Sequence, residues 1–138
     1  MINRLMKTLE VKMLEFEKAF PGTDEISEKL DNPDLRNRID TVNWKEFDYK
    51  TDVAFSIGYT KDEILLKYFV REQYFKAEKT KANQDVYEDS CVEFFVSPAD
   101  DGIYYNFEFN AIGTCLMGTG TGRENRPRTD PEIISRIR

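Results

Sequence analysis

The stretch IYYNFEFNAI, residues 103–112, says more about the fold class than any other part of the chain. Its rings at Tyr105, Phe107 and Phe109 alternate with polar residues, and a β-strand sends alternate side chains to opposite faces of a sheet. We expect these rings to face a core. The residues expected on the opposite face are Tyr104, Asn106, Glu108 and Asn110.

Three further runs indicate that the chain is rich in strands. Residues 53–59 and 64–70 alternate in the same way and are joined by a short polar link, which predicts a β-hairpin. A third apolar run covers residues 91–96, and Asp100-Asp101-Gly102 then turns the chain into the stretch quoted above. Several short strands separated by turns favour a mainly β fold, either a sandwich or a barrel.

The segments that flank these strands are less regular. Residues 1–20 fit either a helical stripe or a strand, and two short helical pieces are expected between residues 23 and 39. We expect the sole tryptophan, Trp44, to pack in the core. Near the C-terminus, the glycine-rich residues 118–122 predict a flexible loop. A capping box at 129–132, with Pro131 in the first turn, then starts a short helix.

Composition excludes several kinds of chemistry. The chain has no histidine, so it can form neither a Ser-His or Cys-His nucleophile pair nor an imidazole-ligated zinc site. Cys91 and Cys115 are too few for a disulfide scaffold, and the strand pattern places them on opposite faces, so we expect both to be reduced. The 20 basic and 26 acidic residues give a net charge of -6, which disfavours nucleic acid and membrane partners.

The N-terminal residues carry charges every few positions and contain no uninterrupted apolar stretch. They therefore predict neither a secretory signal nor a membrane span. As written, the chain is expected in the cytoplasm. A mature form from which a signal has been removed would be periplasmic or extracellular and would look similar at this end.

The polar residues of the expected strands form a candidate binding face. Glu93 faces away from the apolar residues of its strand, as do Lys67 and Arg71 in theirs. Together with Asn106, Glu108 and Asn110 they would present amides and charges to sugar hydroxyls, with aromatic rings nearby to stack on sugar C–H groups. A solvated outer face of a sheet produces the same alternation, and the periodicity leaves both interpretations open.

Other motifs have simpler explanations. Glu93 and Glu108 lie on neighbouring strands and could be the two carboxylates of a glycosidase, yet such pairs are common on sheet faces. The run GTGTGRE at 118–124 lacks the Gly-Lys-Ser/Thr ending of a phosphate loop. Asp100-Asp101-Gly102 could supply calcium ligands, but a turn needs no ion. We assign no catalytic residue and leave the metal ligands unknown.

Residues 86–96, VYEDSCVEFFV, resemble the signature of the family 9 carbohydrate-binding modules. That signature is an aromatic residue, two positions that include an acid, then Asp-Ser-Val-Glu and an apolar strand. Residues 62–70 and 104–110 resemble the strands before and after it. The stretch from about 44 to 115 is similar to stand-alone family 9-like proteins of polysaccharide-degrading bacteria.

The resemblance implies a jelly-roll-like antiparallel β-sandwich that binds glucose-, cellulose- or xylan-type sugars at chain ends without catalysis. It implies that Tyr87 is one wall of an aromatic clamp and that Glu93 accepts hydrogen bonds from sugar hydroxyls. Weaker candidates for the same face are Arg71, Asn106, Glu108 and Asn110. No cofactor is required, although structural calcium often accompanies this fold.

Two departures from the family pattern keep alternatives open. Glu108 stands where the binding modules place an arginine, and the family takes its second clamp aromatic from later strands, so the chain is expected to be truncated. A homodimer would cover the sheet edges that missing strands leave exposed. A glycoside-active enzyme and a structural or interaction sandwich without ligand remain alternatives.

The expected organisation is a single domain over residues 1–138. Residues 1–43 are expected to form an N-terminal strand or helical segment, residues 44–115 the sandwich core, and residues 116–138 a loop and the start of a helix.

Overall fold

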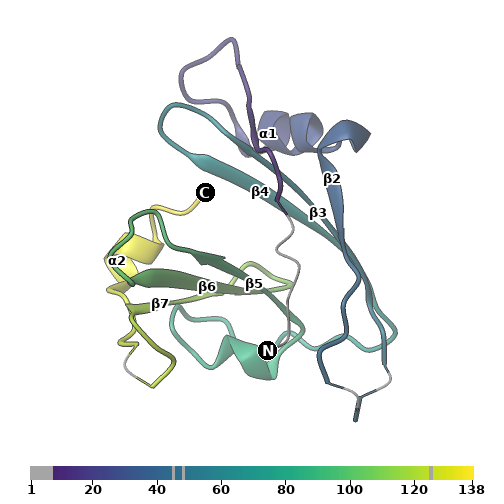
Figure 1. Cartoon of the computed structure of the whole chain (residues 1–138), viewed down its shortest axis with the longest axis vertical. Helices are drawn as coiled ribbons and strands as arrows, with labels where there is room; N and C mark the ends of the chain where they lie inside the picture. Colours follow the sequence, from purple (N-terminus) through teal and green to yellow (C-terminus); the bar gives the residue numbers. More distant parts are fainter. Residues whose placement is uncertain (1–7, 45, 48, 125) are drawn as a thin grey trace. The chain divides into compact units, whose positions relative to one another are not determined.

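The computed structural model describes residues 8–138 except 45, 48 and 125, and the chain divides into two compact units, Met1–Glu72 and Gln73–Arg138 (Figure 1). Each unit is built around its own sheet, and helices are short in both. The chain is therefore mainly β, as predicted, with two sheets and short helices toward its two ends.

The sheet of the first unit is centred on β3 (Asp52–Tyr59). β3 pairs with β4 (Ile64–Arg71) along its whole length in antiparallel register, which confirms the predicted hairpin. On its other side, β3 pairs antiparallel with β2 (Arg36–Ile39) and parallel with the two-residue β1 (Lys12–Met13). Apart from this short parallel pairing, the strand pairs of the described residues are antiparallel, as predicted.

Two short helical pieces precede β2, as expected, and the second of them is shorter than predicted. α1 spans Thr23–Leu30, and a single 3-10 turn, η1, spans Pro33–Leu35. Asn32 caps η1 by accepting a hydrogen bond from the backbone N–H of Asp34 at 3.0 Å. The predicted second helix is wrong beyond Leu35, because backbone pairing with β3 holds the next four residues as a strand. Leu30, Leu35 and Leu65 form the core of this unit.

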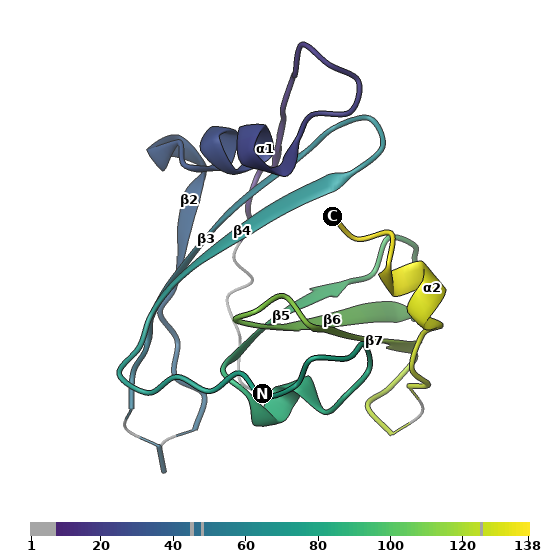
Figure 2. The ribbon, with the colours of Figure 1, turned by 180° about the vertical axis from the view of Figure 1, so that it is seen from behind.

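The second unit contains an antiparallel sheet in the order β5 (Cys91–Val96), β6 (Tyr104–Asn110) and β7 (Cys115–Gly120). A 3-10 turn, η2 (Val86–Glu88), precedes β5, and a short helix, α2 (Pro131–Ile134), follows β7 (Figure 2). Gly102, with a positive φ of 74°, and the Asp101 carboxylate, which accepts from the Ile103 N–H at 2.9 Å, form the turn before β6.

The predicted flexible loop at 118–122 is wrong over its first three residues, which belong to β7. β7 pairs with β6 on one side, and on the other it exchanges backbone hydrogen bonds with the tail. The Thr119 N–H donates to the Pro127 carbonyl at 3.2 Å, and the Thr129 N–H donates to the Met117 carbonyl at 2.7 Å. Hydrogen bonds on both sides keep this glycine-rich segment extended despite its low strand propensity.

The aromatic side of β6 packs around Cys115, Met117 and Ile134. Ile134 comes from α2, whose first turn is capped by Asp130 rather than by Thr129. The Asp130 carboxylate accepts from the Glu132 N–H at 2.9 Å. Cys91 and Cys115 are both free thiols, and they lie on opposite faces as expected.

Two expectations about burial are wrong. The side of β6 expected to face outward is the more deeply buried one: Asn106, Glu108 and Asn110 are 0%, 4% and 4% exposed, whereas the rings of the other face are only half-buried. Trp44 is 64% exposed and does not belong to the core. None of the helices in the described residues is long and apolar enough to cross a membrane.

Candidate functional site

The polar face of the second unit's sheet brings most of the predicted site residues together. Glu93 on β5 is paired with Glu108 on β6, and directly paired residues share one face of a sheet. Asn106 is paired with Phe95 on one side and with Gly118 on the other. A single face therefore carries two carboxylates, an amide and an exposed ring.

Arg71 does not belong to this face. It is the last residue of β4 in the first unit's sheet, whereas Glu93 and Glu108 lie in the second unit's sheet. Lys67 on the same strand pairs with Asp31, whose carboxylate lies 2.7 Å from the Lys67 ammonium. The predicted face that joined Lys67 and Arg71 to the two glutamates is therefore wrong, because β4 and β5 belong to different sheets.

Asn110 has a structural task. Its Nδ2 donates to the Lys79 carbonyl at 2.8 Å and to the Asp89 carboxylate at 2.9 Å, while its Oδ1 accepts from the Thr114 N–H at 2.9 Å. With both ends of the amide occupied, Asn110 has little hydrogen-bonding capacity left for a ligand. The structure thus places this predicted site residue in the framework of the unit.

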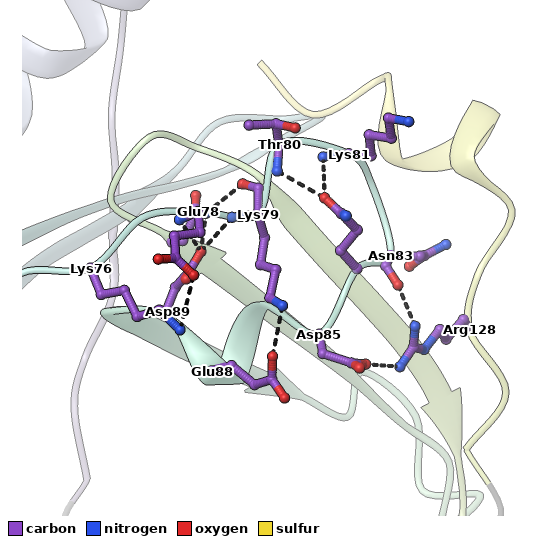
Figure 3. A network of polar contacts seen from close by, with 12 residues as sticks. Lys76, Glu78, Lys79, Thr80, Lys81, Asn83, Asp85, Glu88, Asp89 and Arg128 are labelled. Atoms are coloured by element: carbon purple, nitrogen blue, oxygen red, sulfur yellow. Dashed lines mark hydrogen bonds and ion pairs between the residues drawn. The ribbon is translucent and has the colours of Figure 1, made fainter.

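That framework is a polar network over residues 76–89, which Figure 3 shows from close by. Asp89 accepts from the backbone N–H groups of Glu78 and Lys79 at 3.0 and 2.9 Å. Burial alone would raise the pKa of Asp89, but the hydrogen bonds from Asn110, Lys79 and Glu78 outweigh it and lower that pKa. Lys79 in turn pairs with Glu88 at 2.6 Å. The network therefore anchors η2, where the predicted stacking residue lies.

Tyr87 is 56% exposed on η2, and η2 packs against β5 and β6. The Asp85 carboxylate pairs with Arg128 at 2.5 Å, and this interaction lowers the pKa of Asp85. Partial burial and the Asp85 carboxylate raise the pKa of Tyr87. Much of the ring faces solvent, which suits a stacking platform.

Glu108 is the most unusual carboxylate of the face. Burial raises its pKa, and the charge of Glu93 raises it further. The guanidinium of Arg126, 3.7 Å from the Glu108 carboxylate, opposes this shift, together with Arg128 and Arg123. Two carboxylates paired across neighbouring strands therefore lie beside an arginine that partly balances their charge.

Arg126 is the residue that sequence reasoning missed. Its stem lies against Gly118, where a Cβ atom would stand only 2.9 Å from the Arg126 Cγ. Its guanidinium lies 5.8 Å from the centre of the Tyr104 ring, and that ring lies 5.8 Å from the ring of Phe95. The available signal was the recurrence of arginine at 123, 126 and 128 in a segment that looked like a flexible loop.

Some polar atoms of this face have no hydrogen-bond partner among the described residues. They are both amide atoms of Asn106 and one oxygen, Oε2, of Glu108. Buried polar groups are nearly always paired, so a buried row of unpaired ones is characteristic of a site that a ligand or water completes. Arg126 lies beside these atoms. Its stem lies against Gly118, which is paired with Asn106, and its guanidinium lies near Glu108.

The described residues offer no side-chain cluster for a metal. Across residues 8–138, leaving aside 45, 48 and 125, no three Asp, Glu or Cys side chains come together as ligands. These side chains do not provide the charged cage that calcium prefers, and no role in the site is derived for it. The implied structural calcium stays a prediction.

Comparisons with known proteins identify the family of this two-sheet β chain. The family model for carbohydrate-binding family 9 matches residues 24–138, so the chain belongs to that family. A solved structure of a candidate carbohydrate-binding protein from Bacteroides uniformis is 40% identical, with a TM-score of 0.84. The match covers 92% of this chain and 58% of that protein. No curated protein matches the chain.

Proposed function

We propose that the chain is a non-catalytic module that holds a plant-type or other polysaccharide fragment against the polar face of β5, β6 and β7. The observation that carries this proposal is the row of buried, unpartnered donors and acceptors at Asn106 and Glu108. Sugar hydroxyls both donate and accept, so they complement such a row. The family match and the described role of the Bacteroides protein support the same function.

Tyr87 is the stacking platform in this proposal. Its ring is more than half exposed, and the turn that carries it, η2, packs against β5 and β6. A ring held in advance loses little conformational freedom when it packs on the C–H face of a sugar. Phe95, which is 54% exposed and lies on the same sheet face as Asn106, adds a second apolar surface.

Glu93 accepts hydrogen bonds from sugar hydroxyls in this proposal, and it does not act in catalysis. A glycosidase needs one carboxylate to act as acid and another as base or nucleophile across the scissile bond. Here the second carboxylate, Glu108, is already engaged with the guanidinium of Arg126, 3.7 Å away. Turnover of aryl glycosides that disappears in Glu93→Gln would contradict this assignment.

The test is calorimetric titration of the protein, with calcium present, against gluco-, xylo- and manno-oligosaccharides. Saturable binding of one of them should weaken by about 1–3 kcal/mol in Tyr87→Ala, because the variant loses a central aromatic contact. Phe20→Ala is the matched control, since Phe20 is a 79% exposed ring in the first unit. Equal affinity in the wild type and Tyr87→Ala would overturn the role of Tyr87, and flat titrations throughout would overturn sugar binding.

A further inference from the structure

Arg126 occupies the centre of the polar face although it comes from the tail. Its side chain is 17% exposed, and it reaches the sheet only because Gly118 has no Cβ in its path. The Tyr104 ring lies within cation–π distance of its guanidinium. A long side chain held at its stem and beside a ring has lost much of its rotamer freedom before any ligand arrives.

The guanidinium retains unused hydrogen-bonding capacity. Among the described residues, its polar side-chain contact is the one to Glu108 at 3.7 Å, which is longer than a hydrogen bond. A guanidinium carries five N–H donors in a planar fork that matches two neighbouring oxygen atoms. The Asn106 amide, fully buried and unpartnered at both of its polar atoms, lies one strand away opposite Gly118.

The charges around Arg126 indicate which kind of oxygen pair it faces. Glu93 and Glu108 are paired across β5 and β6, and the positive charges of Arg126, Arg128 and Arg123 act on Glu108 from the other side, so charges of both signs meet here. Adjacent hydroxyls of a neutral sugar suit such a mixed surface, because each hydroxyl both donates and accepts. Their oxygens accept from the guanidinium, and their hydrogens find acceptors at the Glu108 and Asn106 oxygens that have no partner.

From this arrangement we infer that Arg126, oriented by Glu108, is the specificity-determining residue of the face. Its guanidinium recognises a vicinal diol on a neutral sugar by donating hydrogen bonds to the two diol oxygens. The inference rests on the proposed function. It assigns to the polar face a cationic hydrogen-bond donor that comes from the tail and not from β5, β6 or β7. Arg126 contacts the ligand through its fork of donors. Glu108 orients Arg126 through one carboxylate oxygen, Oε1, and its other oxygen, Oε2, accepts from a sugar hydroxyl. The Arg126 guanidinium and the Tyr87 ring would then contact different parts of one saccharide.

The experiment uses the neutral oligosaccharide that binds best in the titrations above, together with its monodeoxy analogues. Arg126→Met keeps a stem against Gly118 but removes every donor, and its affinity should fall about 10- to 100-fold, as expected for a lost hydrogen bond to a charged group. In the wild type, one deoxy analogue should bind about 10-fold more weakly than the parent sugar. In Arg126→Met, the same analogue and the parent sugar should bind with equal affinity. Equal losses in both proteins would overturn the inference.

Arg126→Lys separates recognition from a merely structural role. Lysine keeps the positive charge beside Glu108, but it presents a point charge instead of a planar fork. If Arg126 only balanced the charge of Glu108, the lysine variant would bind like the wild type, and that result would overturn the inference. We expect instead that it folds normally, by circular dichroism and thermal midpoint, and binds nearly as weakly as Arg126→Met.

Gly118→Ala tests the same geometry without changing Arg126. Its added Cβ would crowd the Arg126 stem and should lower affinity, whereas Gly122→Ala has open space around its Cβ and should change nothing.

The proposed function and the role of Arg126 are contradicted by different results. Loss of binding in Tyr87→Ala with no effect of any change at Arg126 or Gly118 would overturn only the present inference. A glucuronic acid derivative that binds better than its neutral parent would overturn the assignment of a neutral ligand.

Discussion

At the scale of single residues, Asn106 shows how a binding face and a stable fold compete. Its side chain is completely buried, and neither amide atom has a partner among the described residues. An unsatisfied buried polar group costs about 1–3 kcal/mol of folding free energy. Retaining such a residue is understandable where a ligand supplies the missing hydrogen bonds.

Asn106→Leu should therefore stabilise the protein while it abolishes sugar binding. We expect the free energy of unfolding in urea to rise by about 1 kcal/mol, because leucine has a similar size and no polar atoms to satisfy. Asn110→Leu is the matched control, since Asn110 is equally buried but fully hydrogen-bonded, and it should lose stability. A loss of stability in both variants would show that Asn106 is satisfied in the folded protein.

At the scale of elements, the segment before β5 matters because it positions η2. Asp89 joins the backbone of Glu78 and Lys79 to Asn110 on β6, so one carboxylate connects this segment to the sheet (Figure 3). Its pKa is lowered in the folded protein. The stability it contributes is thus fully present above its unfolded pKa, whose usual value is 3.8, and is lost as the pH falls through the lower folded value.

Asp89→Asn should loosen this segment before it affects the rest of the sheet. The neutral amide is a weaker acceptor for the two backbone N–H groups, so amide hydrogen exchange over residues 76–90 should accelerate more than exchange in β6. Acidification of the wild type below its usual carboxyl range should have the same local effect. Asp100→Asn, in the turn before β6, is the control. Identical exchange over residues 76–90 in wild type and Asp89→Asn would contradict the role of the network.

The elements also show where pattern reading succeeds and where it fails. The hairpin of β3 and β4 and the strands β5 and β6 follow from the alternation of apolar and polar residues along the sequence. The end of β7 is not predicted in this way because its glycines, Gly118 and Gly120, have weak strand propensity. Their extended form depends on partners in β6 and in the tail, which no local pattern contains.

At the scale of the whole molecule, the division into two units localises the expected effect of a ligand. The residues proposed to contact sugar, Tyr87, Glu93, Asn106, Glu108 and Arg126, all lie within Gln73–Arg138. A ligand present at 100 times its dissociation constant stabilises the state that binds it by about 2.7 kcal/mol. Saturating sugar should therefore slow hydrogen exchange in β5, β6 and β7 more than in β3 and β4. Stronger protection of β3 and β4 would place the binding site in the first unit.

The sequence by itself determined the strand-rich character of the chain, its central strands and its family, because these depend on local alternation and on one contiguous eleven-residue motif. It also placed Tyr87 and Glu93 within the same eleven-residue motif. Only the tertiary structure decided which predicted polar residues share a face: it moved Arg71 to another sheet, committed Asn110 to the framework and brought in Arg126. The reason is physical. Alternation shows that two sets of side chains face opposite ways, but the segments that cover each face come from distant parts of the chain, and they decide which set is buried.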